Sequence, residues 1–351
     1  MTENKKEQKN KTQKNKILNK DKTIEVTGIG NAIIDIVASV DDDFLLKHNL
    51  DKGSMKLICE VEALDLHSKL NIKKMISGGS AANTIAGMAY LGDKVAFIGK
   101  VKNDKFGLEF EKDLKKLGVI FKTKKAQGNC PSTACCIVLT TPDAQRTMNT
   151  FLGISCMLSE KDIDEKIISN SKIVYIEGYL FDQETAKNAV FKAIDLSFKY
   201  NCITAISMSD NFCVQRNLDI FKELIFNNKI NICFGNEDEI NQFFKTKSVD
   251  DAILEIKKLN VETIFVITLG FKGSVVCVKD NTFFVEAHKV DTVDTTGAGD
   301  LYASGFLHGY VNNRDLYSCA KIGSLVAAQI VSQYGARPQK SLLELLSQHN
   351  I

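Results

Sequence analysis

The segment VDTTGAGDLYASGFLHGY, residues 293–310, joins an extended stretch to a pattern with helical spacing. Gly297 and Gly299 let the backbone take unusual dihedral angles and approach a ligand closely. The N–H groups that open a helix have no partners inside it and carry the positive end of the helix dipole. The segment therefore predicts a glycine turn into a helix that cradles an anion such as a phosphate.

Asp300 lies in the first turn of this predicted helix and would project into the same cradle. Binding a phosphate does not require a carboxylate there, whereas phosphoryl transfer to an alcohol requires a base for the hydroxyl proton. Gly297, Ala298 and Gly299 would supply backbone N–H groups, and Asp300 would act as the base. The alternative is that Asp300 only caps the helix and the glycines shape a tight turn.

The composition narrows the class of protein. The chain has 351 residues, of which 44% are hydrophobic, and a net charge of +2. This length allows a sizeable core, so we expect one large α/β domain with an appendage. The balanced charge and the lack of an apolar run of 18 residues give no sign of a nucleic-acid or membrane partner. The ten cysteines form no C-x-x-C pair, which favours apolar core positions in a reducing cytoplasm.

The order of predicted elements indicates how the chain is organised. Residues 1–22 are rich in lysine and asparagine and are expected to form a disordered tail, followed by a folded domain over 23–351. Strands and helices alternate over roughly 170 residues, which predicts a mostly parallel sheet covered by helices on both faces. Short strands within about 36–60 and 130–152 interrupt this alternation and predict a small accessory sheet that serves as a lid.

Three motifs resemble one known family. DTTGAGD, residues 294–300, resembles the C-terminal signature of the ribokinase-like (PfkB) family of ATP-dependent small-molecule kinases. GGSAANTIAGMAYLG, residues 78–92, is similar to its N-terminal signature, and NEDE at 236–239 fits its N-x-x-E motif. The resemblance spans residues 24 to about 338. It implies a ribokinase-like α/β fold with a β-sheet lid, and the use of ATP and Mg²⁺.

The resemblance also assigns the acceptor side of the site. It implies that Asp35 binds a sugar through its hydroxyls and that Asn31 contacts the substrate. Gly79 and Asn83 would be further substrate contacts, next to Gly78. The alternatives are a solvated polar pair at a turn for Asn31 and Asp35, and close helix packing for the small residues around 78–87.

On the donor side, the resemblance places ATP against the glycines of TLGFKGS and against the N-x-x-E motif. The residues implied are Asn236, Thr268, Gly270 and Gly273. Arg146, on the predicted lid, matches an arginine that covers the transferred phosphate, where its guanidinium would stabilise phosphoryl charge. The alternatives are that Arg146 is a solvated arginine at a turn, and that the glycines of TLGFKGS only shape the chain before a hairpin.

The same resemblance implies two metal sites. One helical turn separates Asn236 from Glu239, so both can face one ligand, and Glu239 is expected to hold a Mg²⁺-bound water. Asp294 and Thr296 match a monovalent-cation site, and their oxygens would suit K⁺.

The substrate prediction depends mainly on residues 30–58, GNAIIDIVASVDDDFLLKHNLDKGSMKLI, which resemble the adenosine kinase branch. The D-x-N-x-R pattern frequent in sugar kinases is broken, because Arg216 follows Ser209-Asp210-Asn211 at a distance. We therefore expect transfer to the 5′-hydroxyl of adenosine. The alternatives are a ribokinase- or fructokinase-like sugar kinase and a non-catalytic nucleoside or sugar sensor. A dinucleotide-binding oxidoreductase is disfavoured, because Ile33 replaces the third glycine of G-x-G-x-x-G.

Overall fold

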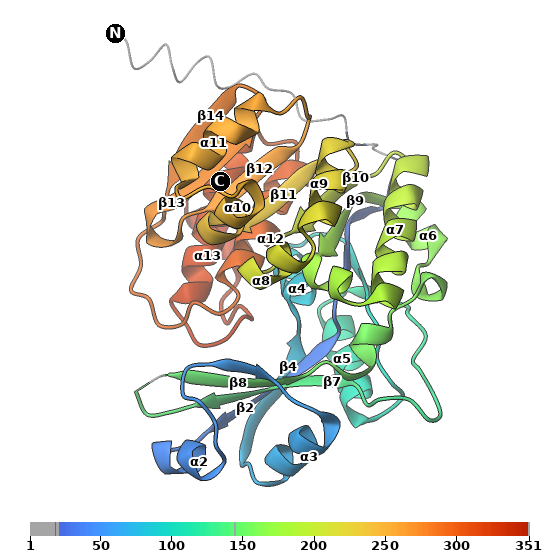
Figure 1. Ribbon diagram of the computed structural model, residues 1–351, viewed down its shortest axis with the longest axis vertical. Coiled ribbons are helices and arrows are strands. Elements are labelled where there is room, and N and C mark those ends of the chain that lie inside the picture. Colours follow the sequence, from blue (N-terminus) through green and yellow to red (C-terminus); the bar gives the residue numbers. More distant parts are fainter. Residues whose placement is uncertain (1–17, 19–20, 144, 350–351) are drawn as a thin grey trace.

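The computed structural model describes residues 18, 21–143 and 145–349, which build two sheets (Figure 1). The larger has nine strands in the order β14-β13-β12-β11-β10-β9-β1-β5-β6. The smaller has five strands in the order β3-β8-β7-β2-β4 and lies below the larger one in Figure 1. The predicted fold class, a mostly parallel α/β sheet with a second small sheet, is confirmed.

The large sheet is parallel from β12 to β6, and an antiparallel hairpin extends one edge. Its central strands are apolar on both faces, as in residues 171–177, where Ile173 and Tyr175 face one core and Val174 and Ile176 the other. The strands are β1 Ile24–Ile29, β5 Val95–Ile98, β6 Ile120–Phe121, β9 Ser171–Glu177, β10 Ile203–Ser207, β11 Ile232–Asn236, β12 Ile264–Thr268, β13 Gly273–Val278 and β14 Asn281–Glu286.

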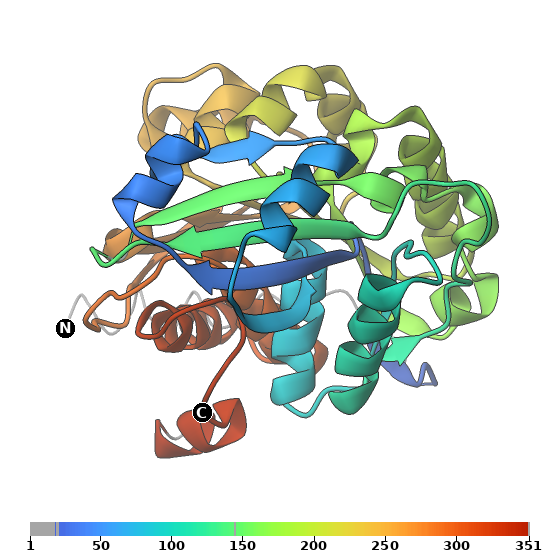
Figure 2. The same ribbon diagram turned by 90° about the horizontal axis from the view of Figure 1, so that it is seen from below.

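Helices cover both faces of this sheet (Figure 1). One core contains residues of α4 Ser80–Tyr90, α5 Lys105–Lys116, α12 Ala298–Val311 and α13 Leu316–Val331. The other contains residues of α6 Glu165–Ser169, α7 Glu184–Lys199, α8 Asn211–Arg216, α9 Leu218–Phe226, α10 Glu237–Phe244 and α11 Val249–Lys258. A last helix, α14 Leu342–Gln348, packs through Leu342 and Leu346 near Leu91 and is seen apart from the main body in Figure 2.

The small sheet combines strands from both segments that were predicted to form the lid, with one further strand that was not predicted. Its strands are β2 Ile33–Ser39, β3 Met55–Leu57, β4 Ile72–Gly78, β7 Ala134–Thr140 and β8 Arg146–Phe151, with helices α2 Asp42–Lys47 and α3 Glu60–Ser68 beside them. Figure 2 shows these strands side by side as one layer. The unpredicted strand β4 is an edge strand whose IKKMISG sequence exposes two lysines, so it lacks a strong apolar pattern.

The N-terminal region bears on the expected tail. Residues 1–17 and 19–20 of it lie outside the described residues. Lys22, at its predicted end, is buried and donates through Nζ to the carbonyl oxygen of Ser171 at 2.9 Å. Within the described parts of the chain, we find no helix with the length and apolar character needed to cross a membrane.

Candidate active site

A polar cavity of about 280 Å³ lies where three neighbouring parallel strands end. Ser207, Asn236 and Thr268 are the last residues of β10, β11 and β12, and all three line it. The N-termini of α4 and α12 close the other side. Lining residues from these helices and the preceding turn are Ser80, Thr295, Gly297, Ala298, Gly299, Asp300 and Tyr302. The predicted anion cradle thus opens into a cavity.

The turn before α12 has the geometry expected from its glycines. Gly297 is the N-cap of α12 and has a left-handed backbone with φ of 77°. A Cβ on Gly297 would lie 2.6 Å from the Cβ of Ala336. A Cβ on Gly299 would meet no atom of the described residues within 4 Å, so this side of the turn is open. The turn is therefore packed on one side and accessible to a ligand on the other.

Asp300 is held in place by two donors from α4. Ser80 Oγ donates to its Oδ1 at 2.7 Å, and Asn83 Nδ2 donates to its Oδ2 at 2.9 Å. Burial raises the pKa of Asp300, while these two hydrogen bonds and the charge of Arg337 act in the opposite direction. The carboxylate thus lines the cavity in a fixed orientation and is more basic than an exposed aspartate.

Asp35 lies on the small sheet with its carboxylate against Gly78, outside the described lining of the polar cavity. It lies on β2, and the place that a Cβ on Gly78 would occupy is 2.4 Å from its Oδ2. Burial raises the pKa of Asp35 to about 6, although the charges of Arg337 and Arg146 lower it. Gly79, with φ of 95°, leaves no room for a Cβ, which would lie 2.2 Å from the carbonyl oxygen of Asn31. Both positions therefore require glycine, because the Asp35 carboxylate and the Asn31 carbonyl approach the backbone there too closely for a Cβ.

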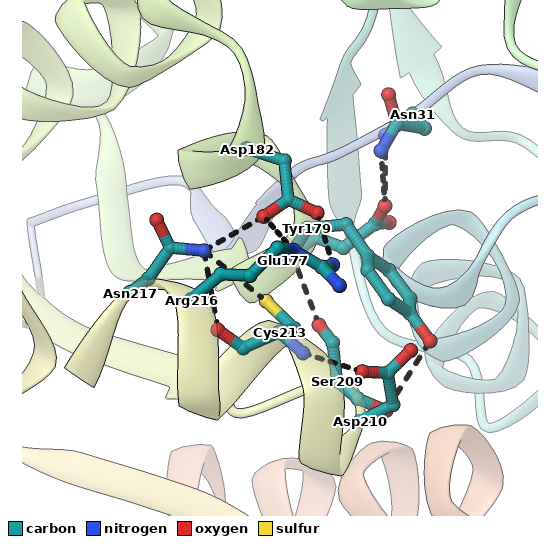
Figure 3. Close-up of polar contacts among 9 residues, drawn as sticks. All are labelled: Asn31, Glu177, Tyr179, Asp182, Ser209, Asp210, Cys213, Arg216 and Asn217. Carbon is teal, nitrogen blue, oxygen red and sulfur yellow. Dashed lines mark hydrogen bonds and ion pairs between the residues drawn. The ribbon is translucent and has the colours of Figure 1, made fainter.

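Asn31 was predicted to contact substrate, and the structure gives its side chain a protein partner. Its Nδ2 donates to Glu177 Oε1 at 2.6 Å, and its backbone N–H donates to the same oxygen at 3.3 Å (Figure 3). The N–H of Ala81 donates to Glu177 Oε2 at 3.0 Å. Burial raises the pKa of Glu177 to about 7 against these hydrogen bonds. Sequence reasoning missed Glu177, whose only signal was a carboxylate at the end of an apolar strand.

Ser209, Asp210 and Arg216, which were compared with the D-x-N-x-R pattern, have separate partners within the protein. Asp210 caps α8 by accepting from the N–H of Cys213 at 2.6 Å, and Ser209 Oγ accepts from the N–H of Tyr179 at 3.2 Å (Figure 3). Arg216 instead pairs with Asp182 through Nε at 3.0 Å and a second nitrogen at 2.6 Å, with about half of its side chain exposed. Of these residues, Ser209 lines the polar cavity, and Arg216 is outside its described lining.

Arg146 links the small sheet to the turn before α12. From the start of β8, its guanidinium donates to Asp294 Oδ2 at 2.6 Å and contacts Thr296 Oγ1. Burial favours the neutral acid, but amide donors from Gly335 and Thr296, with the charge of Arg146, hold the pKa of Asp294 below its usual range. The residues predicted for a phosphate contact and for a cation site thus contact one another. The cation site stays a prediction, and a bound cation would share these oxygens with a guanidinium.

A second, larger cavity adjoins the polar one. It measures about 760 Å³ and shares Thr268, Thr295, Ala298, Gly299 and Tyr302 with it. Its remaining lining is mainly apolar and includes Phe271, Val290, Ala327, Ala328 and Val331. Three predicted nucleotide residues, Thr268, Gly270 and Gly273, line this cavity, and Asn236 lines the polar one. The pair of cavities suits a ligand with a flat apolar end and an anionic end.

Comparison with known proteins now places this site in a family. The family model described as pfkB family carbohydrate kinase matches residues 51–342. The chain belongs to this family. The resemblance in its three motifs is thereby confirmed, and the protein is a phosphotransferase with a hydroxyl acceptor.

Similar proteins include kinases of different substrates. The structure of an adenosine kinase from Sinorhizobium meliloti has a TM-score of 0.85 and 39% identity, covering 93% of this chain and 99% of that one. A probable sugar kinase from Rhizobium etli CFN 42 also has a TM-score of 0.85, with 36% identity and coverage of 94% and 99%. A 5-dehydro-2-deoxygluconokinase from Listeria monocytogenes is 27% identical over 266 residues, covering 74% of this chain and 82% of the relative.

Membership of this kinase family implies ATP and Mg²⁺, and the residues fit both. The polar cavity offers the backbone N–H group of Gly299 beside the mainly apolar cavity of about 760 Å³. Glu239 lines the polar cavity, and burial raises its pKa to about 7. Its Oε1 and Oε2 accept from Asn236 at 2.6 and 3.0 Å, so a capping box fixes the carboxylate at the start of α10. Within the described chain, no three His, Cys, Asp or Glu side chains form a group that could hold a metal ion.

Proposed function

We propose that this kinase transfers the γ-phosphoryl group of ATP to the 5′-hydroxyl of adenosine. The observation that carries the proposal is Asp300, a carboxylate oriented by Ser80 and Asn83 beside the open glycine turn of α12. Adenine of ATP would occupy the apolar cavity, and its phosphates would extend through the shared wall into the polar cavity.

In this mechanism the oxygen of the acceptor hydroxyl forms a bond to the γ-phosphorus while the hydroxyl proton passes to Asp300. The bond between the γ-phosphorus and the oxygen that bridges to the β-phosphate breaks, and ADP leaves with its electron pair. The N–H group of Gly299 would stabilise charge on the phosphoryl oxygens, because the helix dipole aligns with it. The N–H of Ala298 already donates to the carbonyl oxygen of Thr295 at 3.1 Å. Arg146 would contribute positive charge from the small sheet, which would also exclude water. Bound Mg²⁺ would neutralise charge on the phosphates, and Glu239 would orient its water.

The acceptor subsite would be formed by Asp35, Gly78, Gly79 and Asn83. A carboxylate accepts hydrogen bonds from two vicinal hydroxyls, and the missing side chain of Gly78 leaves room for the Asp35 carboxylate beside the backbone. Residues 30–58 and the 39% identical adenosine kinase support a ribonucleoside. We further propose a cytoplasmic location, where the unbonded cysteines would stay reduced.

A sugar kinase is the second candidate, favoured by the curated relatives. The 5-dehydro-2-deoxygluconokinase of Bacillus subtilis is 24% identical, and coverage reaches 94% of this chain and 97% of the relative. Asp35 and Asn83 would recognise hydroxyls of a free sugar equally well.

The proposal is tested by incubating the protein with ATP, Mg²⁺ and one of a panel of acceptors, and by measuring the ADP that is released. We expect turnover with adenosine to exceed turnover with other nucleosides, ribose, fructose and 5-dehydro-2-deoxygluconate. Turnover with a free sugar alone would replace adenosine by the second candidate. Tight binding of an acceptor without ADP release would instead indicate a sensor.

A further inference from the structure

The short segment Gln333–Arg337 follows α13 and contacts both halves of the proposed site. On one side, the N–H of Gly335 donates to Asp294 Oδ2 at 2.8 Å, and Ala336 fills the space beside Gly297. On the other side, Arg337 reaches the junction between β4 and α4. Gln333 Nε2 donates to the carbonyl oxygen of Arg337 at 2.6 Å and so closes the segment on itself.

The Arg337 guanidinium is buried, with 6% of the residue exposed. One terminal nitrogen donates to the carbonyl oxygen of Ala82 at 3.0 Å. The other donates to the carbonyl oxygen of Ser77 at 2.5 Å and to its Oγ at 2.8 Å. Its Nε has no hydrogen-bond partner among the described residues. Burying a charge costs free energy, and here the hydrogen bonds to Ser77 and Ala82 offset part of that cost.

Ser77 extends this contact to a third element. Its Oγ donates to Asp113 Oδ2 on α5 at 2.6 Å, and its N–H donates to the same oxygen at 2.9 Å. Ser77 precedes Gly78 and Gly79, and Ala82 precedes Asn83. Arg337 therefore holds the backbone on both sides of Gly78 and Gly79 and directly before Asn83.

We propose that Arg337 is a positioning residue that fixes the Gly78–Asn83 segment relative to the glycine turn at Gly297 and to Asp300. The expected change in acceptor KM rests on the proposed function. The fixed position of residues 78–83 does not depend on it. Since the Asn83 amide also holds Asp300, a displaced α4 N-terminus would misplace both the acceptor and the base.

Charge adds a second, separable effect. The ionisable groups around the guanidinium are Asp35 on β2, Tyr90 on α4, Asp113 on α5 and Asp300 on α12. The positive charge of Arg337 lowers the pKa of both Asp35 and Asp300. Arg337→Lys changes the hydrogen-bond geometry and keeps the charge, whereas Arg337→Met removes both.

Steady-state kinetics and amide hydrogen exchange test the proposal, with Arg216→Lys as a matched control at an exposed ion pair. For Arg337→Lys we expect the acceptor KM to rise about 10- to 100-fold, as for lost hydrogen bonds to a charged group. Exchange of the amides of residues 77–83 should become faster, and the KM for ATP should change much less. For Arg337→Met the acid limb of the kcat/KM profile should also move to higher pH.

Ser77→Ala provides a second variant in case an Arg337 variant does not fold. It removes the hydroxyl between Arg337 and Asp113, and we expect the same changes at smaller size. If folded variants lose thermal stability alone, with acceptor KM and exchange at 77–83 as in the control, Arg337 has only a structural role and the proposal is wrong. If the wild type phosphorylates no acceptor, the proposed function fails, and hydrogen exchange still decides the positioning role.

Discussion

The two adjoining cavities differ in chemistry although they share a wall. The smaller is lined by polar groups and holds the carboxylate of Asp300, whereas the larger is mainly apolar and includes Ala328 and Val331. A preorganised polar site lowers a barrier, and an apolar compartment mainly contributes affinity. The comparison predicts that substitutions in the two cavities affect different kinetic constants.

Asp300→Asn should have the largest effect, on the polar side. We expect kcat to fall by about 10²- to 10⁴-fold because the base is lost. The fold should persist, since the new amide nitrogen can face Ser80, whose hydroxyl can accept, while Asn83 still donates to the amide oxygen. ADP release and the thermal melting temperature measure the two effects.

Asp315→Asn is a suitable control for this variant. Asp315 caps α13 by accepting from the N–H of Ser318 at 3.0 Å, and asparagine caps nearly as well. Turnover by Asp300→Asn that matches this control would falsify the assignment of the base.

The second expected effect is a pH dependence of acceptor binding. Because the pKa of Asp35 is raised to about 6, its carboxylate is ionised above that pH and becomes protonated below it. The acceptor KM should therefore rise as the pH falls from about 7 to 5, by up to about tenfold per pH unit below the pKa. In Asp35→Asn, KM should be high and nearly constant over this range; an unchanged slope would show that another group is responsible.

On the apolar side, Val331→Ala should have a smaller and different effect. It shortens an apolar side chain of the larger cavity, so we expect the KM for ATP to rise about three- to tenfold. Because this contact is the same in ground and transition states, kcat should stay within about twofold of the wild type. A fall in kcat without a change in the KM for ATP would contradict the expectation that the apolar cavity contributes to binding and the polar cavity to catalysis.

The smallest expected effect concerns monovalent cations. Asp294 and Thr296 already contact the Arg146 guanidinium, which places a positive charge at these oxygens, so replacing K⁺ by tetramethylammonium should leave kcat nearly unchanged. Assays at constant ionic strength measure this. A complete loss of activity without K⁺ would establish the cation site at these two residues.

The sequence predicted the parts of the site that depend on local chain geometry. The glycine turn and the start of α12 near Asp300 involve neighbours in the chain. Asn236 and Glu239, which were predicted to face one ligand, are equally close in the chain but pair with each other in a capping box. Apolar runs that alternate along the chain with helical segments likewise predicted most strands of the large sheet. These features are readable because glycine dihedral angles, helix ends and strand burial impose local residue preferences.

Other parts could not be read because their partners are distant in the chain. Glu177 and Asn31 are 146 residues apart, and Arg337 lies 260 residues from Ser77. Their type and spacing resemble those of ordinary surface residues until the fold brings them together. The strand β4 was missed because an edge position tolerates lysines that a central strand would exclude.

The carboxylate proposed to bind the acceptor and the proposed base belong to different elements, since Asp35 lies on β2 of the small sheet and Asp300 lies in the first turn of α12. The proposed acceptor residues thus come partly from the small sheet and partly from α4, where Asn83 also holds Asp300. Exchange of β2 between family members would change the acceptor side while leaving α12 and the lining of the two cavities in place. This separation offers a structural route by which one scaffold could diversify among nucleosides and sugars, in evolution or by engineering.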